Sequence, residues 1–96
     1  MIFVRRISGH SMMPTLKAGK IVFAFKSEQY FKDDIVLFSH DGLDKIKRIA
    51  NVSSDNVFVL GDNMNHSTDS RVFGSINKSD IKGKVIWPLN KIKEYR

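Results

Sequence analysis

The 96-residue chain contains no cysteine. It therefore forms no disulfide, offers no thiolate to a metal ion and has no cysteine nucleophile, so any covalent chemistry must come from other side chains. Proline and glycine are also scarce, at two and six residues, and no Gly-rich or Pro-rich linker divides the chain. We therefore expect a single domain, residues 1–96, whose apolar residues (42%) suffice for a modest core.

Long apolar runs are missing as well. A membrane-spanning helix needs roughly 18 apolar residues, whereas the apolar start of this chain, residues 1–4, ends at Arg5 and Arg6. No signal-peptide pattern is present. If the chain is complete, we expect a soluble, cytoplasmic protein. If a span has been removed, we expect a membrane-associated protein outside the cytoplasm.

Acidic residues are few, with 10 Asp and Glu against 16 Lys and Arg and a formal net charge of +6. Such an excess of positive charge suits an anionic neighbour, either nucleic acid or an anionic lipid surface. The charge alone does not distinguish these two partners.

No long stretch repeats its apolar residues with the helical period of 3.6. Short apolar segments separated by turn residues follow one another instead, at residues 2–7, 21–25, 35–38, 45–52, 57–60 and 84–87. Asp41-Gly42 predicts a hairpin turn, and residues 77–80 predict a short helical turn. The pattern indicates an all-β fold, a mainly antiparallel barrel or sandwich with at most short helical turns.

The segment Gly9-His10-Ser11-Met12-Met13-Pro14-Thr15-Leu16 follows the first predicted strand. Gly9 permits a sharp turn, and Pro14 prevents a sheet ladder from continuing. We therefore expect Ser11 on a bend at the end of a strand, with its hydroxyl presented, which is where a nucleophilic serine would lie. Taken alone, the segment is more simply interpreted as an ordinary turn.

A serine hydroxyl becomes a strong nucleophile only when a base takes its proton. One base is His66, which with Asp69 would complete a Ser-His-Asp triad with Ser11. The other is Lys47, which lies beside Ile46 in a predicted strand. Burial in apolar surroundings would lower its pKa toward neutrality, and a nearby positive charge such as that of Arg48 would act in the same direction. The residue pattern leaves both bases open.

Three stretches, in this order, resemble the type I signal peptidase family: Ser-Met-Met-Pro-Thr-Leu from Ser11, Lys47-Arg48-Ile49, and the loop from Gly61 to Gly74. The resemblance runs from about residue 7 to residue 87. Short members of the family that mature nickel-type superoxide dismutase lack a membrane span. This chain is similar to them in having no apolar run long enough for a span and in its Gly-x-Ser-Met-x-Pro-Thr-Leu pattern. Self-cleaving SOS repressor domains share a Ser-Lys arrangement but lack the third stretch.

The resemblance implies a serine endopeptidase, a hydrolase with a Ser-Lys dyad, on a mainly antiparallel β fold. It would remove an N-terminal leader or signal peptide from a precursor protein, cutting after a small residue. Matched position by position, Ser11 is the nucleophile, Lys47 is the general base, and the hydroxyl of Ser67 orients the lysine amine. Asp69 and Arg71 form a supporting ion pair.

The resemblance also assigns Gly61, Asp62 and Asn63 to a turn that brings the loop under the active site. Some family members have a serine two residues before the nucleophile that stabilises the oxyanion. Gly9 occupies that position here and has no side chain, so a second donor besides the backbone N–H of Ser11 must come from elsewhere.

The implied partner is an extended peptide or leader segment of a precursor protein, bound alongside a strand. We expect a small apolar pocket that admits Ala or Gly, at a site formed by Ile7, Gly9, Met12, Leu16 and Ile46. Nothing in the sequence indicates a metal site or an organic cofactor.

The alternative is a non-enzymatic small basic β-domain that binds nucleic acid or an anionic membrane surface through its basic and aromatic residues. Its basic residues are spread along the chain and no nucleic-acid motif is present, so we do not expect nucleic acid as a partner. Contact with an anionic membrane surface remains compatible with the charge.

Overall fold

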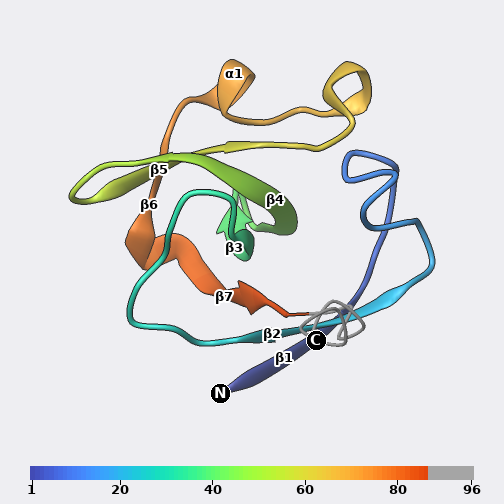
Figure 1. Ribbon diagram of the computed structural model, residues 1–96, viewed down its shortest axis with the longest axis horizontal. Helices are drawn as coiled ribbons and strands as arrows, with labels where there is room; N and C mark the ends of the chain where they lie inside the picture. The colour runs from blue at the N-terminus through green and yellow to red at the C-terminus, as the bar shows by residue number, and fades with distance from the viewer. Residues whose placement is uncertain (87–96) are drawn as a thin grey trace, which may run out of the picture.

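A computed structural model describes residues 1–86 and contains one seven-stranded sheet in the order β1-β2-β7-β3-β4-β5-β6 (Figure 1). All its strand pairs are antiparallel. The strands are β1 (Ile2–Arg6), β2 (Ile21–Phe25), β3 (Ile35–His40), β4 (Leu43–Val52), β5 (Asn56–Leu60), β6 (Ile76–Asn77) and β7 (Ile81–Val85). The predicted all-β, mainly antiparallel fold is confirmed.

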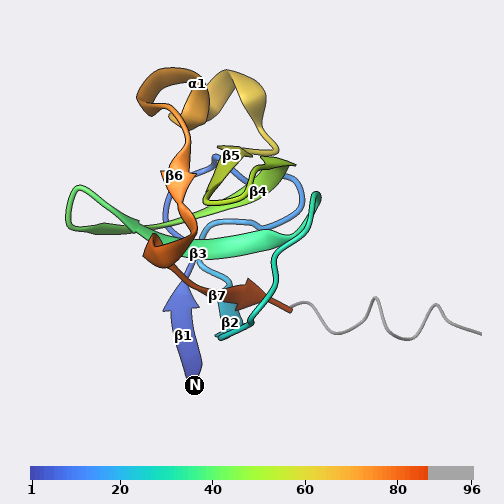
Figure 2. The same ribbon diagram turned by 90° about the vertical axis from the view of Figure 1, so that its left-hand side faces the viewer.

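Helical structure is limited to short turns, as the sequence predicted. These are η1 (Met64–His66), α1 (Ser70–Phe73) and η2 (Lys78–Asp80). The turn at 77–80 was predicted, whereas α1 and the two-residue β6 are too short to leave a periodic signal. In Figures 1 and 2, α1 lies at the end of the molecule opposite β1. No helix within residues 1–86 is long and apolar enough to cross a membrane.

The last strand differs from the prediction over 84–87. It begins earlier, at Ile81, because Ile81, Gly83 and Val85 alternate as buried positions along β7. Trp87 lies outside the described residues. β7 lies between β2 and β3 and pairs with both, so the last described strand joins the N-terminal hairpin to the rest of the sheet.

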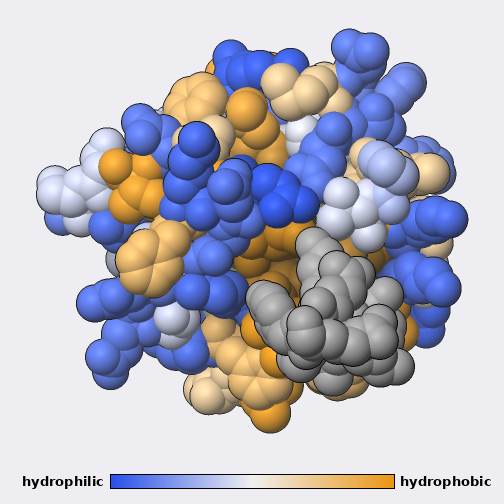
Figure 3. All heavy atoms as spheres, in the orientation of Figure 1, coloured by the Kyte–Doolittle hydropathy of each residue, from blue (hydrophilic) through white to orange (hydrophobic). Residues whose placement is uncertain are grey.

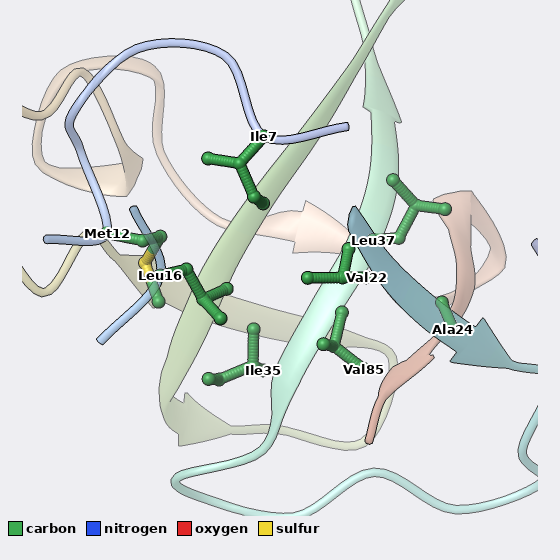
Figure 4. Packing of buried hydrophobic residues seen from close by; sticks show 8 residues of the cluster. All are labelled: Ile7, Met12, Leu16, Val22, Ala24, Ile35, Leu37 and Val85. Carbon is green, nitrogen blue, oxygen red and sulfur yellow. The ribbon is translucent and has the colours of Figure 1, made fainter. Parts of the chain in front are cut away.

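β3 is buried on both faces, which explains its continuous apolar sequence. Ile35 and Leu37 pack into one cluster and Val36 and Phe38 into another. The first cluster, drawn in Figure 4, comprises Ile7, Met12, Leu16, Val22, Ala24, Ile35, Leu37 and Val85. The second comprises Val36, Phe38, Ile49, Val57, Val59, Ile76 and Ile81.

The outer face of the β1–β2 hairpin carries exposed apolar side chains, among them Ile2, Val4 and Phe23. In Figure 3, hydrophilic side chains cover much of the visible face, while apolar ones gather at its lower edge, where Figure 1 places β1 and β2. The inner face of the hairpin contributes Val22 and Ala24 to the first cluster. Along β2, buried positions therefore alternate with more exposed ones.

We predict that Phe38→Ala lowers the free energy of unfolding by about 3–5 kcal/mol, because the ring is fully buried and leaves a cavity. Phe31→Ala is the matched control: that ring is 57% exposed, and its loss should change stability by no more than about 0.5 kcal/mol. Urea denaturation followed by circular dichroism measures both. Equal destabilisation by the two variants would contradict the two-cluster core.

Candidate active site

The side chains of Ser11 and Lys47 meet in the folded chain. Lys47 Nζ lies 2.7 Å from Ser11 Oγ, and a hydrogen bond joins them. Ser11 lies in the turn after β1 and is half-buried, whereas Lys47 lies on β4 and is only 6% exposed. The structure thus brings together residues 36 positions apart in the sequence.

The turn that carries Ser11 is fixed at its base and at its tip. At the base, Ile7 N–H donates to the Lys20 carbonyl at 2.7 Å, and Gly19 N–H donates to the Ile7 carbonyl at 2.8 Å. At the tip, Met12 and Leu16 are each 2% exposed and point into the first cluster (Figure 4). Two buried side chains that flank the turn therefore hold Ser11 against β4.

Burial lowers the pKa of the Lys47 amine, because the charged form loses hydration. The positive charge of Lys45 lowers this pKa further, and the negative charge of Asp69 opposes the shift. The sequence suggested Arg48 as the cation that lowers the pKa of Lys47. The Arg48 guanidinium is instead hydrogen-bonded to Asp62, and the cation that lowers this pKa is Lys45. Burial and the charge of Lys45 thus both shift the amine toward its neutral form.

Asp62 joins the three stretches singled out in the sequence. Its carboxylate receives two hydrogen bonds of 2.8 Å from the guanidinium of Arg48 on β4. It also accepts a 2.5 Å hydrogen bond from the hydroxyl of Thr15, in the segment that contains Ser11. Sequence reasoning missed Thr15, although it lies within the Pro-Thr-Leu motif, because its partner is 47 residues away.

The neighbours of Asp62 contact the backbone around Ser11. Asn63 N–H donates to the Ser11 carbonyl at 2.8 Å, and the Asn63 side chain donates to the His10 carbonyl at 3.0 Å. Gly61 lies so close that a Cβ at this position would be 2.6 Å from the Ser11 carbonyl oxygen. Glycine is required here for space, and the turn does lie against the serine, as the resemblance implies.

Asp69 is fully buried and satisfied by several donors. Its carboxylate accepts from the Gly61 N–H at 2.9 Å, from the Ser67 hydroxyl at 2.8 Å and from the Arg71 guanidinium at 2.9 and 3.1 Å. Burial by itself would raise the pKa of this carboxyl. The hydrogen bonds from Arg71, Gly61 and Ser67 outweigh it and hold the pKa well below its usual range.

The Ser67 hydroxyl has a different hydrogen-bond partner from the one that the resemblance implies. Its hydroxyl donates to Asp69, while the one side-chain hydrogen bond of Lys47 within residues 1–86 goes to Ser11. The physical reason is that an ionised carboxylate two residues away is the stronger acceptor. Ser67 thereby helps to hold the carboxylate whose charge acts on the Lys47 amine.

In the described residues, His66 and Asp69 do not form a catalytic triad with Ser11. His66 is exposed in η1, and its side chain makes no hydrogen bond to Ser11 or Asp69 in the described part of the chain. The donors to Asp69 are Gly61, Ser67 and Arg71. Of the two bases left open by the sequence, the lysine is the one next to the serine.

A cleft of about 300 Å³ opens beside this pair. Its lining residues are Arg5, Arg6, Ile7, Ser8, Ser11, Met12, Leu37, Asp44, Lys45, Ile46 and Lys47. Three of the five residues expected at the substrate site, Ile7, Met12 and Ile46, therefore lie in its wall. Leu16 instead packs in the core, and Gly9 lies outside the lining, exposed in a turn with φ of 79°.

Within residues 1–86, the two strands beside the cleft each have an edge without a partner strand. Among the described strands, β1 pairs only with β2 and lies at one end of the sheet. The first half of β4 pairs with β3, whereas β5 pairs with β4 only from Arg48 onward. Backbone groups at such edges can pair with an added strand. The cleft is thus suited to an extended peptide.

Comparison with known proteins gives consistent matches. The family described as signal peptidase, peptidase S26, matches residues 42–90. Mitochondrial inner membrane protease subunit 1 of Homo sapiens is 32% identical over 113 aligned residues, covering 86% of this chain and 68% of the relative. The protein of the same name from Mus musculus is 30% identical with the same coverage. Signal peptidase I of Leptolyngbya laminosa is 39% identical over 46 residues, covering 45% of this chain and 23% of the relative.

We predict that Asp69→Asn lowers the free energy of unfolding at pH 7 by about 3 kcal/mol, because charged hydrogen bonds to a buried group are lost. The folded-state pKa of Asp69 is lowered. Its stabilisation is therefore present above the unfolded pKa and is lost as pH falls below about 4. Urea denaturation at several pH values measures both effects.

The matched control for this substitution is Asp55→Asn, at an exposed aspartate in the turn before β5. It should change stability by no more than about 0.5 kcal/mol. Asp69→Asn variants as stable as the control at pH 7, with the acid dependence of the parent chain unchanged, would refute this role of Asp69.

Proposed function

Because the chain belongs to the signal peptidase family, peptidase S26, and is thus a peptidase, we propose that it is a serine endopeptidase with a Ser11–Lys47 dyad. It removes an N-terminal leader from a precursor protein and cuts after a small residue. The observation that carries the proposal is the 2.7 Å contact between Ser11 Oγ and the buried amine of Lys47, in the wall of a cleft.

In this mechanism the neutral Lys47 amine takes the proton of Ser11 as the serine oxygen attacks the scissile carbonyl carbon. The tetrahedral intermediate collapses when the lysine gives that proton to the leaving amine, which departs and leaves an acyl-serine. Lys47 then takes a proton from water, and the hydroxide formed releases the leader and restores the serine. The dyad thus serves both half-reactions without a histidine.

The negative charge of the intermediate needs donors fixed in place. The backbone N–H of Ser11 is one of them. A second donor has to come from the cleft wall, where Ser8 supplies the other hydroxyl group of the lining. Ser8 precedes Gly9, so its position differs by one residue from the serine that some family members use.

The leader would lie extended between the β1 edge and the first half of β4, completing backbone hydrogen bonds at both. Ile7, Met12 and Ile46 narrow the cleft with apolar side chains, which favours Ala or Gly before the cut. Two precursor types fit this arrangement: a secretory leader presented at a membrane, and the leader of a soluble precursor.

We predict that Ser11→Ala abolishes cleavage of an Ala-x-Ala leader peptide while the fold is retained. Lys47→Arg should do the same, because a guanidinium stays protonated and cannot accept the serine proton. His66→Ala is the control and should keep most of the activity. Peptide hydrolysis followed by chromatography measures all three, and circular dichroism checks the fold. An inactive His66→Ala beside a normally active Lys47→Arg would replace the dyad with the triad.

We also predict that kcat/KM rises with pH as the Lys47 amine loses its proton. Because burial lowers the pKa of Lys47, the midpoint should lie below the ordinary lysine value of about 10.4. Lys45→Gln removes a positive charge that lowers this pKa, so its midpoint should move to higher pH. Lys32→Gln, at an exposed lysine outside the cleft, should leave the midpoint in place. An unshifted midpoint in Lys45→Gln would contradict the electrostatic contact.

A further inference from the structure

The wall of the cleft carries more positive charge than its own carboxylate neutralises. Asp44 is the one acidic residue among the lining residues. It pairs with Arg5 at 2.8 Å and also with Lys82 of β7 at 2.8 Å. In the described part of the chain, Arg6 and Lys45 form no ion pair, so both remain available to an anion in the cleft.

Lys45 lies where a bound peptide would pass. It precedes Lys47 by two residues on β4, so the two side chains share a face of the strand and lie about 7 Å apart along it. The first half of β4 is also the half that has one edge unpaired by any strand of residues 1–86. A peptide that adds to this edge with its scissile bond at Ser11 therefore brings a residue about two positions from the cut to the Lys45 amine.

The surroundings of Lys45 favour a carboxylate over a neutral group. The side chain is half-buried, and its amine lies 5.9 Å from the centroid of the Phe73 ring. Arg6 lies in the cleft wall contributed by β1, where its guanidinium donates to the Gly19 carbonyl at 3.0 Å. A basic peptide side chain would be repelled by both cations, and like-charge repulsion is an effective source of specificity.

We propose, on the basis of the function proposed above, that Lys45 selects substrates carrying Asp or Glu about two residues from the cleaved bond. The substrate class is then an extended peptide with a small residue at the cut and an acidic residue close to it. Lys45 is a specificity-determining residue, distinct in role from Lys47. Its partner is a carboxylate of the bound peptide.

The test compares peptides that differ at a single position within three residues of the cut, which carries Asp, Asn or Lys. At the selected position kcat/KM should be about threefold to fivefold higher for Asp than for Asn, as expected for one partly exposed ion pair. It should be lowest for Lys. The preference should shrink as added salt screens the charges.

Substitutions show whether Lys45 or Arg6 causes the preference for the Asp peptide. Lys45→Gln should bring the Asp/Asn ratio close to one, and Lys45→Glu should reverse the order so that the Lys peptide is preferred. Arg6→Gln distinguishes the two cationic positions, and Lys32→Gln controls for net charge. Because Lys45 also affects the Lys47 amine, the ratio between peptides is the readout, since a change in general base strength affects all peptides alike. A ratio unchanged in Lys45→Gln but lost in Arg6→Gln would overturn the assignment.

Binding separates this inference from the proposed function. The same peptides are titrated into the Ser11→Ala variant, with and without Lys45→Gln, and fluorescence anisotropy gives their dissociation constants. Tighter binding of the Asp peptide that depends on Lys45 supports the selection even if cleavage is absent, an outcome that would overturn only the peptidase mechanism. Equal binding and equal cleavage of the Asp and Asn peptides would overturn the selection and leave the dyad standing.

Discussion

The carboxylate of Asp62 fixes the relative positions of the three segments that form the site. It is hydrogen-bonded to Arg48 on β4 and to Thr15 in the serine-bearing turn, and it belongs to the loop that follows β5. The bidentate geometry restricts both distance and orientation, which a single apolar contact would not. Because Lys47 precedes Arg48 in the chain, the same contact that anchors Arg48 sets the position of the lysine relative to Ser11.

This arrangement solves an electrostatic problem. A lysine in a nearly dry site is costly while charged, so the chain must supply neighbours that do not stabilise its charge. Asp69 lies close enough to act on Lys47, but its charge is taken up by Arg71 and by the donors Gly61 and Ser67. Arg71 therefore influences the Lys47 amine through Asp69, without contacting the lysine itself. The short helix α1 begins immediately after Asp69, whose carboxylate caps it by accepting from the Arg71 N–H.

Much of this could be predicted from the sequence. Short alternating segments revealed six of the seven strands, since the strand period is visible within five residues, and the motif order indicated the family. The partner of Ser67 could not be predicted, because a hydroxyl chooses between acceptors that only the fold places near it. Leu16 illustrates the same limit: an apolar residue beside a serine suits a pocket or a core equally well. Thr15 was missed because its partner, Asp62, is distant in the sequence.

The position of β7 affects the order in which the strands can pair while the chain is being synthesised. A chain emerging from the ribosome can pair β1 with β2 early, and β3, β4 and β5 can follow as successive hairpins, since these contacts are local. The two groups of strands remain unjoined by the sheet until β7 enters between β2 and β3. Ser11 belongs to the first group and Lys47 to the second. The sheet that carries both segments is therefore expected to close only after synthesis has passed residue 85.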